Sequence, residues 1–226
     1  MAPERPKEPR SRPRLHRHAQ ATRQKLMNAA RAVFAERGLD LGRIDEITER
    51  ADVGKGTFYY HFRNKEELVA ELIRETLAQL VKVIEEKCAG LTDLKSLLDA
   101  LISAHISFFC NRWEDFVLYF QGRTDLTLQE GYQGIQTPFL DYLSRVEALV
   151  ASVIKYRLPQ PVLRRIGCAV AGFVPGYYSF AVISQDEDID ETFRSLRGAI
   201  VASLARFIQE AIPPSEPARE HGDQTN

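Results

Sequence analysis

The chain has 226 residues, and its 30 Lys and Arg residues nearly balance 31 Asp and Glu residues, giving a net charge of −1 at pH 7. The length allows one large domain or two modest ones, and the total charge alone says nothing about nucleic acid. The charges are segregated, however, because residues 1–65 hold 15 Lys or Arg against 8 Asp or Glu, whereas residues 66–226 hold 15 against 23. This pattern suits a head that faces phosphates and a body that avoids them.

The cysteines and the apolar segments exclude several classes of protein. Cys88, Cys110 and Cys168 are widely spaced and follow no metal-ligand pattern, which fits a reducing cytoplasm rather than a disulfide framework. They are expected to be buried small hydrophobes, with a redox-sensing thiol as the alternative. The Pro- and Arg-rich start lacks the apolar core of a signal peptide. Residues 166–185 carry no charge over nearly the length of a membrane span, but their glycines, proline and tyrosines favour a buried helix, so we expect no membrane association and no cofactor.

The first elements in chain order are an arm and a helix. Prolines recur among arginines in residues 1–15, so residues 1–19 are expected to be a flexible basic arm. The arm either contacts phosphates or the minor groove or is a disordered leader. From about Gln20 to Arg37, apolar residues recur at helical spacing, and Gly38 supplies a C-terminal stop.

Two short helices are predicted next, over about 43–51 and 55–62. Phe58 and Phe62 are four apart and should share a buried face. The second helix otherwise carries hydrogen-bond donors, and its run 53–62 contains no acid. A helix, a tight turn and a donor-rich helix form the arrangement that lays side chains into a DNA major groove.

The segments 44–47, 53–62 and 64–68 together resemble the tetracycline-repressor (TetR) family of bacterial transcription regulators. The resemblance covers roughly residues 20–80 and implies an all-α homodimer of about nine helices that binds a double-stranded DNA operator. It places a helix-turn-helix DNA-binding domain at 20–80, with the motif at about 43–62. An effector-binding and dimerisation domain would follow at 81–212, and then a disordered tail at 213–226. The residues that match DNA-contacting positions or neighbour them are Arg43, Lys55, Gly56, Thr57, Tyr59, Tyr60, His61 and Lys65.

Four positions in this region call for separate expectations. Gly42 stands where the family has a Thr or Ser cap, and Gly54 replaces the customary Ser before the recognition helix, so each should weaken a helix start. Asp52 occupies a turn position that usually holds Gly, where a left-handed backbone is expected, which Asp tolerates. The spacing of Tyr60 also allows it to pack against the first helix or the helix after the motif.

The remaining helices follow from apolar spacing. A long helix is predicted over about 65–87, and Thr92 is predicted to cap the next one. A short aromatic helix begins near Trp113, and residues 121–137 are expected to be a loop, partly helical at most. Pro138 is expected to be the first residue of another helix. The uncharged segment and a last helix over about 189–211 complete the chain.

The second half of the chain supplies candidates for two further sites. Aromatic residues gather between Phe108 and Tyr178, which suggests a cavity for an apolar or aromatic effector, although packing in a core is the alternative for each. Small residues on the uncharged helix suit close packing against a neighbour, and packing inside one subunit is the alternative. The resemblance to the TetR family implies a two-fold four-helix interface built from the last two helices of each subunit. The effector candidates are His105, Phe109, Trp113, Phe116, Phe120, Phe139, Tyr142 and Tyr178. The interface candidates are Gly172, Gly176, Phe193, Leu196, Ile200, Leu204 and Phe207.

We therefore predict a ligand-responsive repressor that binds a pseudo-palindromic operator as a dimer. An effector-independent architectural DNA binder is the alternative, and footprinting separates the two because only a regulator protects a discrete operator. An enzyme or carrier that uses the aromatic cavity ranks lower, since the sequence shows no nucleophile–base pair, no phosphate loop and no paired His ligands.

Overall fold

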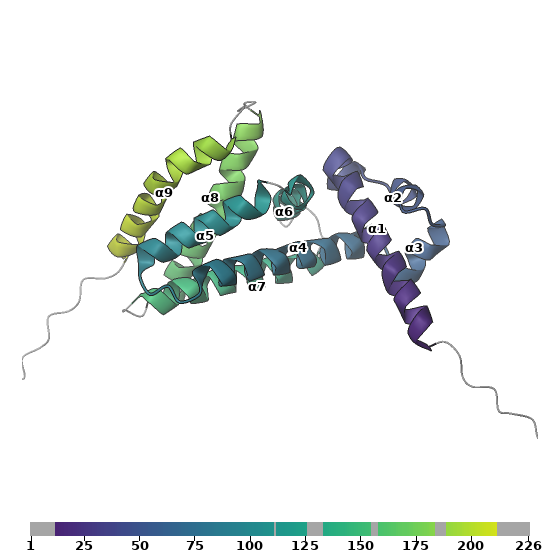
Figure 1. The fold of residues 1–226 in the computed structure, drawn as a ribbon, viewed down its shortest axis with the longest axis horizontal. Helices are drawn as coiled ribbons and strands as arrows, with labels where there is room; N and C mark the ends of the chain where they lie inside the picture. The colour runs from purple at the N-terminus through teal and green to yellow at the C-terminus, as the bar shows by residue number, and fades with distance from the viewer. Residues whose placement is uncertain (1–11, 111, 126–132, 155–157, 184–188, 212–226) are drawn as a thin grey trace, which may run out of the picture. The chain divides into compact units, whose positions relative to one another are not determined.

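The computed structural model describes residues 12–110, 112–125, 133–154, 158–183 and 189–211, which contain nine α-helices and no strand. The all-α class expected from the sequence is therefore confirmed. The helices, drawn in Figure 1, are α1 (Arg12–Leu41), α2 (Ile44–Arg50), α3 (Lys55–His61), α4 (Lys65–Cys88), α5 (Leu94–Phe109), α6 (Trp113–Asp125), α7 (Gln133–Val153), α8 (Gln160–Ile183) and α9 (Ile189–Ala211).

The helices divide into two compact units. Unit 1 consists of residues 1–78 and 112–138, as far as these are described, and unit 2 of residues 79–111 and 139–226. Unit 1 thus contains α1, α2, α3, the first part of α4 and, from much later in the sequence, α6. The sequence gives no local sign that α6 belongs with the first helices.

The first helix is longer than its apolar spacing predicts. It begins at Arg12, inside the segment expected to be a flexible arm. Pro13 is tolerated there because a proline in the first helical turn loses only an N–H that has no partner within the helix. Gly38 interrupts the helix with a φ of 82°, and the helix then continues to Leu41.

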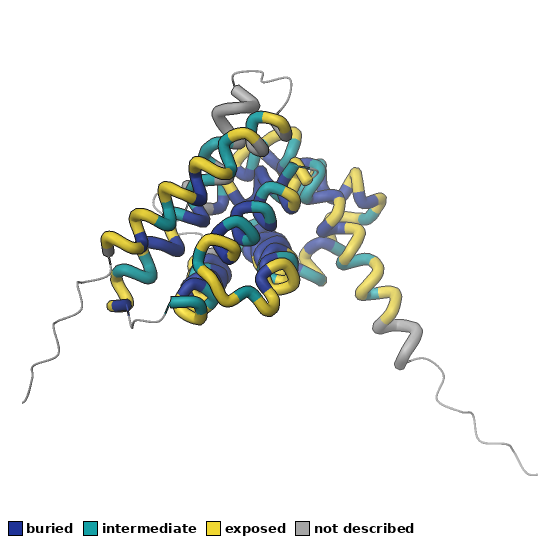
Figure 2. The backbone as a smooth tube through the Cα atoms, turned by 60° about the vertical axis from the view of Figure 1, so that its left-hand side comes forward, coloured by how far each residue is buried: buried dark blue, intermediate teal, exposed yellow. Residues whose placement is uncertain are grey.

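The core of unit 1 lies where α1, α2, α3 and the start of α4 turn their apolar faces toward one another. Along the described helices, buried positions alternate with exposed ones (Figure 2). Phe34, Leu39, Phe58, Phe62 and Leu68 are each no more than 2% exposed. Phe58 and Phe62 were expected to share a buried face, and the burial of these five residues holds α3 against the rest of the unit.

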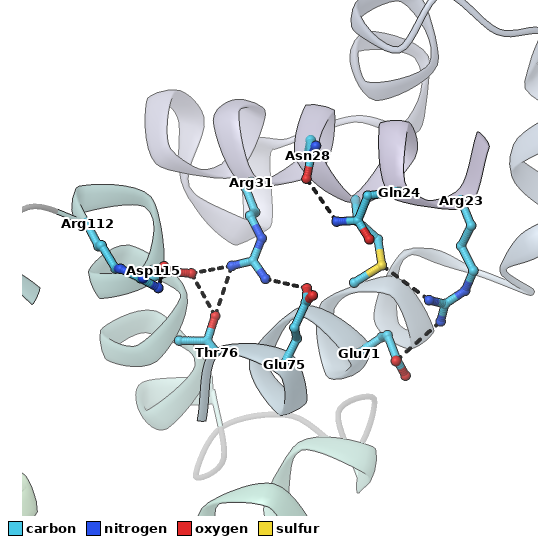
Figure 3. Close-up of polar contacts among 10 residues, drawn as sticks. Arg23, Gln24, Asn28, Arg31, Glu71, Glu75, Thr76, Arg112 and Asp115 are labelled. Carbon is cyan, nitrogen blue, oxygen red and sulfur yellow. Dashed lines mark hydrogen bonds and ion pairs between the residues drawn. The ribbon is translucent and has the colours of Figure 1, made fainter. Parts of the chain in front are cut away.

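A cluster of polar side chains joins α1, α4 and α6 within unit 1 (Figure 3). Arg31 of α1 makes an ion pair with Asp115 of α6 and lies 2.6 Å from a Glu75 carboxylate oxygen of α4. Its guanidinium also donates to the Thr76 hydroxyl at 2.9 Å, and that hydroxyl donates to Asp115 at 2.8 Å. The Arg31 and Asp115 side chains are only 12% and 13% exposed, so each charge depends on its partners.

A second contact holds α6 to the C-terminal end of α1. The Gln121 side-chain oxygen accepts a hydrogen bond from the backbone N–H of Leu39 at 2.7 Å. This bond satisfies an N–H just after the interruption at Gly38, where helical hydrogen bonding is broken. The helix α6 is therefore fixed to α1 at two points that are eight residues apart in α1.

Two predicted helix starts after α4 are wrong. Asp93, not Thr92, caps α5, because the Asp93 side chain accepts a hydrogen bond from the backbone N–H of Ser96 at 2.9 Å. Helix α7 begins at Gln133, so Pro138 lies inside the helix and not at its first position. An interior proline removes one helical hydrogen bond, which is why the sequence rule places proline at a helix start.

Unit 2 is built from α5, α7, α8, α9 and the last part of α4. Helices α5, α8 and α9 contact one another, and side-chain bonds join α7 to α5 and to α8. Glu147 of α7 is almost fully buried and pairs with Arg164 of α8 at 2.5 Å. None of the described helices combines the length and the apolar character that crossing a membrane requires.

Candidate DNA-binding surface

The turn between α2 and α3 has the geometry of a helix-turn-helix. Asp52 adopts a φ of 55°, and within the described residues no other non-glycine residue has a positive φ. The Val53 N–H returns to the Thr48 carbonyl at 3.0 Å, which closes the turn. The expectation that Asp replaces Gly in a left-handed conformation is confirmed.

Gly42 has a different role from the one expected. The N-cap of α2 is Arg43, whose backbone N–H donates to the Glu46 carboxylate at 3.1 Å. A Cβ at Gly42 would lie 2.6 Å from the Phe34 ring, so only glycine lets the chain pass this close to a core aromatic side chain. The departure from a Thr or Ser is therefore explained by packing and not by capping.

The third helix presents two different faces. Phe58 and Phe62 are buried with their ring centroids 5.7 Å apart. Tyr59 and Tyr60 are 52% and 78% exposed, although large aromatic side chains are usually well buried. Tyr60 thus packs against neither the first helix nor α4, and both tyrosines offer their rings and hydroxyl groups to a partner.

The other candidate residues of α3 lie at its start and end. Gly54 is the N-cap without a side-chain hydrogen bond, as expected. Thr57 and His61 are half-buried, and Lys55 is exposed. Burial, and then the charge of Arg23, lowers the pKa of His61, so the imidazole is neutral at physiological pH and has one N–H to donate.

No packing within the described part of the chain requires a glycine at position 56. A Cβ at this position would meet no atom within 4 Å, and the residue is exposed in a helical segment. Glycine in a helix destabilises it by roughly 0.5–1 kcal/mol relative to alanine. We therefore expect the backbone of α3 to approach another molecule closely at this position.

Replacing Gly56 by alanine should therefore raise stability and weaken DNA binding at the same time. We expect the free energy of unfolding to rise by about 0.4–1 kcal/mol, because alanine restricts the unfolded chain. The added methyl group should meanwhile hold α3 away from the groove. Urea unfolding and a gel-shift titration of the same preparation measure both effects, and equal or tighter DNA binding by this variant would contradict the close approach.

Lys65 and Arg43 differ in how free their charges are. Lys65 Nζ lies 2.9, 3.0 and 3.3 Å from the carbonyl oxygens of Leu39, Asp40 and Gly42. An ammonium has three N–H donors, so Lys65 ties the start of α4 to the end of α1 and has none left for a phosphate. The Arg43 side chain is 75% exposed and can reach a phosphate at the start of α2.

Sequence reasoning missed one residue on this surface. Lys55 Nζ of α3 lies 2.7 Å from the Asp45 carboxylate of α2. The hydrogen bond and charge of Lys55 lower the pKa of Asp45, and Asp45 raises the pKa of Lys55 by the same contact. No periodicity or spacing rule links these two positions, and only the packing of α2 against α3 brings them together.

The effector candidates fall into both units. In unit 2, His105 and Tyr142 meet, with His105 Nε2 2.5 Å from the Tyr142 hydroxyl and Nδ1 2.6 Å from the Leu101 carbonyl. Phe109 and Phe139 are also buried in this unit. The Tyr142 hydroxyl must donate to Nε2, because Nδ1 carries the proton that Leu101 accepts. The side chain of Tyr178 lies outside the described residues.

The other three effector candidates belong to α6 and thus to unit 1. Trp113 and Phe116 stack with centroids 5.5 Å apart, and Phe116 and Phe120 with centroids 5.8 Å apart. Phe116 is buried, whereas Trp113 and Phe120 are 43% and 36% exposed. The structure therefore forms two aromatic groups, a buried one around α5 and α7 and a stacked one along α6.

The buried His105 should make folding stability depend on pH. Burial lowers its pKa from 6.5 to about 4, so the folded chain resists protonation that the unfolded chain accepts. Stability present above pH 6.5 is lost as the pH falls toward 4, by at most about 1.4 kcal/mol per pH unit. Urea unfolding of the wild type and of His105→Gln between pH 7 and 5 measures this effect. Equal pH slopes for the two proteins would contradict it.

The dimer candidates lie on α8 and α9. A Cβ at Gly172 or Gly176 would meet no atom within 4 Å. Phe207 is 45% exposed, Leu196 and Leu204 are half-buried, and Ile200 is buried at 7%. The side chain of Phe193 lies outside the described residues. The interface itself stays a prediction.

A family model described as bacterial regulatory proteins, tetR family, matches residues 26–72, which contain the end of α1, α2, α3 and the start of α4. Over 141 residues the chain is 28% identical to the transposon Tn10 TetC protein of Escherichia coli, covering 60% of this chain and 66% of that protein. Over 82 residues it is 33% identical to the fatty acid metabolism regulator protein of Bacillus subtilis, covering 36% and 42%. The chain thus matches less than two thirds of the length of either curated relative.

Solved structures extend the likeness of fold to most of the chain. FadR from Bacillus subtilis, solved in complex with stearoyl-CoA, has a TM-score of 0.64 and 22% identity, covering 84% of this chain and 98% of that chain. GusR from Salmonella enterica has a TM-score of 0.67 and 19% identity, covering 84% and 96%. At these identities the likeness establishes the fold alone.

Proposed function

We propose that this chain, which belongs to the TetR family of bacterial regulatory proteins, is a transcriptional repressor. It binds a pseudo-palindromic operator as a homodimer. It releases the operator when a small apolar or aromatic effector binds. The observation that carries the DNA-binding part is the exposure of Tyr59 and Tyr60 beside Lys55, on a helix anchored from behind by the buried Phe58 and Phe62. Such a helix is held firmly and presents exposed donor side chains to a groove.

The short recognition helix explains why a dimer is proposed. Helix α3 has seven residues, and a helix of this length reaches only a few base pairs. Two copies related by a two-fold axis would read two half-sites on one face of the duplex. A Cβ at Gly172 of α8 would meet no atom within 4 Å, and Phe207 of α9 is exposed, which supports these helices as the place where the copies meet.

Footprinting of the intergenic DNA next to the gene tests the proposal. We expect one discrete protected region with an approximate inverted repeat, because each subunit would read the same bases. The logarithm of affinity should fall linearly with the logarithm of salt concentration as counterions are released from neutralised phosphates. Even coverage without a preferred site would favour an architectural binder, and salt-independent binding would contradict phosphate contacts.

The effector part is supported by the buried aromatic group around the His105–Tyr142 pair in unit 2. A site of this chemistry would take an apolar or aromatic body and anchor one polar group. Titration of the protein–operator complex with small aromatic compounds, and with a long-chain acyl-CoA because FadR was solved with stearoyl-CoA, tests it. Operator affinity that no compound changes would overturn induction while leaving DNA binding intact.

A further inference from the structure

The proposed DNA-binding surface contains an acid, which a surface that only attracts phosphates would avoid. Asp45 lies on α2 with its carboxylate 2.7 Å from Lys55 Nζ and 3.8 Å from an Arg43 nitrogen. The side chains of Asp45 and Lys55 are 54% and 56% exposed, so the pair is open to a ligand. Since Asp45 cancels the charge of Lys55, the pair adds little to general attraction for DNA.

The surroundings of the pair leave it accessible from outside. Gly54 and Gly56 flank Lys55, and a Cβ at either position would meet no atom within 4 Å. No side chain from these neighbours therefore screens the ammonium. The hydrogen bond and charge of Lys55 lower the pKa of Asp45, so the carboxylate stays ionised and accepts hydrogen bonds throughout the physiological pH range.

The pair presents a donor and an acceptor side by side, in a fixed order. On the major-groove edge of a G·C base pair, guanine offers the acceptors N7 and O6 and its cytosine partner offers the N4 donor. Lysine is a common ligand of guanine O6 and N7, and aspartate accepts from cytosine N4. Adenine gives the ammonium a single acceptor at this edge, so a G·C pair complements the two groups better.

We infer that Asp45 and Lys55 act as one specificity-determining unit that reads a G·C base pair in each half-site of the operator. The inference rests on the proposed function and adds to it the class of base pair that is read. Asp45 would hold Lys55 toward a base edge, so that a cation otherwise available to any phosphate contributes to sequence selection.

A binding-selection experiment with the full-length protein tests the unit. The probes are operator duplexes in which each half-site position is replaced symmetrically by all four base pairs, together with a non-operator duplex. We expect the wild type to prefer G·C at one position by roughly 10-fold or more. Asp45→Asn should bind non-operator DNA more tightly and reduce this preference, whereas Lys55→Arg, which keeps a donor for guanine, should retain it.

Two further variants separate reading of a base from a change of net charge. Glu49→Gln removes one negative charge from the same helix but at a residue that faces the hollow between α1 and α2. It should leave the preference unchanged. In a Lys55→Met background, Asp45→Asn should no longer alter the preference, because the unit is already broken.

Several results would overturn the inference. One is an equal effect of Asp45→Asn and Glu49→Gln with an unchanged preference at every position. Another is a preference for A·T at the only position that responds to Asp45→Asn. If the wild type selected no sequence at all, the proposed function itself would fail, which is a different result from selection that ignores Asp45. Urea unfolding of each variant establishes that it is folded.

Discussion

Replacing Lys55 by methionine and Tyr59 by phenylalanine is expected to weaken operator binding by about 10³-fold or more. Each lost contact to a base or phosphate is worth at least about 1 kcal/mol, and a dimer loses each of the two contacts twice. Both side chains are more than half exposed, at 56% for Lys55 and 52% for Tyr59. Neither change removes a buried group, so the free energy of unfolding should change by no more than about 0.5 kcal/mol. Gel-shift titration and urea unfolding of the same variant measure the two quantities.

The matched control for this variant is Lys82→Met on α4. The Lys82 side chain is 77% exposed, and its contact is an ion pair with Glu86 one helical turn away at 4.0 Å. The substitution Lys82→Met removes a lysine charge by the same chemical change as Lys55→Met, but from a residue of unit 2. Operator binding should therefore stay nearly unchanged. If the folded double variant of Lys55 and Tyr59 bound the operator as well as this control does, the recognition surface would have to lie elsewhere on the chain.

The features of unit 1 that could be predicted from the sequence are local ones. The spacing of Phe58 and Phe62 indicates which face of α3 is buried, and both are buried with less than 3% exposure. The left-handed conformation at Asp52 could be predicted because Asp is one of the few residues other than Gly that tolerate it. Such rules work because the interactions that decide them lie within one helical turn or one tight turn.

The features that could not be predicted depend on contacts between distant segments. Lys65 looks like a free cation in sequence, and its role appears only when the carbonyl groups at the end of α1 surround its ammonium. The pairing of Asp45 with Lys55 likewise requires the packing of α2 against α3. The same holds for α6, which packs on α1 although 71 residues separate Leu41 from Trp113 in the chain.

The ion pair between Arg31 of α1 and Asp115 of α6 leads to a prediction about folding stability. Replacing Asp115 by alanine should lower the free energy of unfolding by about 2–4 kcal/mol, because removal of one partner leaves a poorly solvated charge behind. The Arg31 side chain is 12% exposed and would keep Glu75, whose side chain is 34% exposed, together with the Thr76 hydroxyl. The expected loss is therefore below that of a fully buried pair with no other partner. Urea unfolding at pH 7 measures it.

A double-mutant cycle distinguishes this loss from a simple loss of packing. Arg31→Met and Asp115→Leu should each destabilise the protein. The two changes combined should lose less than the sum of the single losses, because an apolar pair needs no solvation. Arg63→Met serves as the surface control, since the Arg63 side chain is 87% exposed in its ion pair with Glu67 and such pairs contribute about 0–1 kcal/mol. Strictly additive losses at Arg31 and Asp115 would mean that the two charges do not depend on each other, and that α6 is held to α1 by its apolar face and by Gln121.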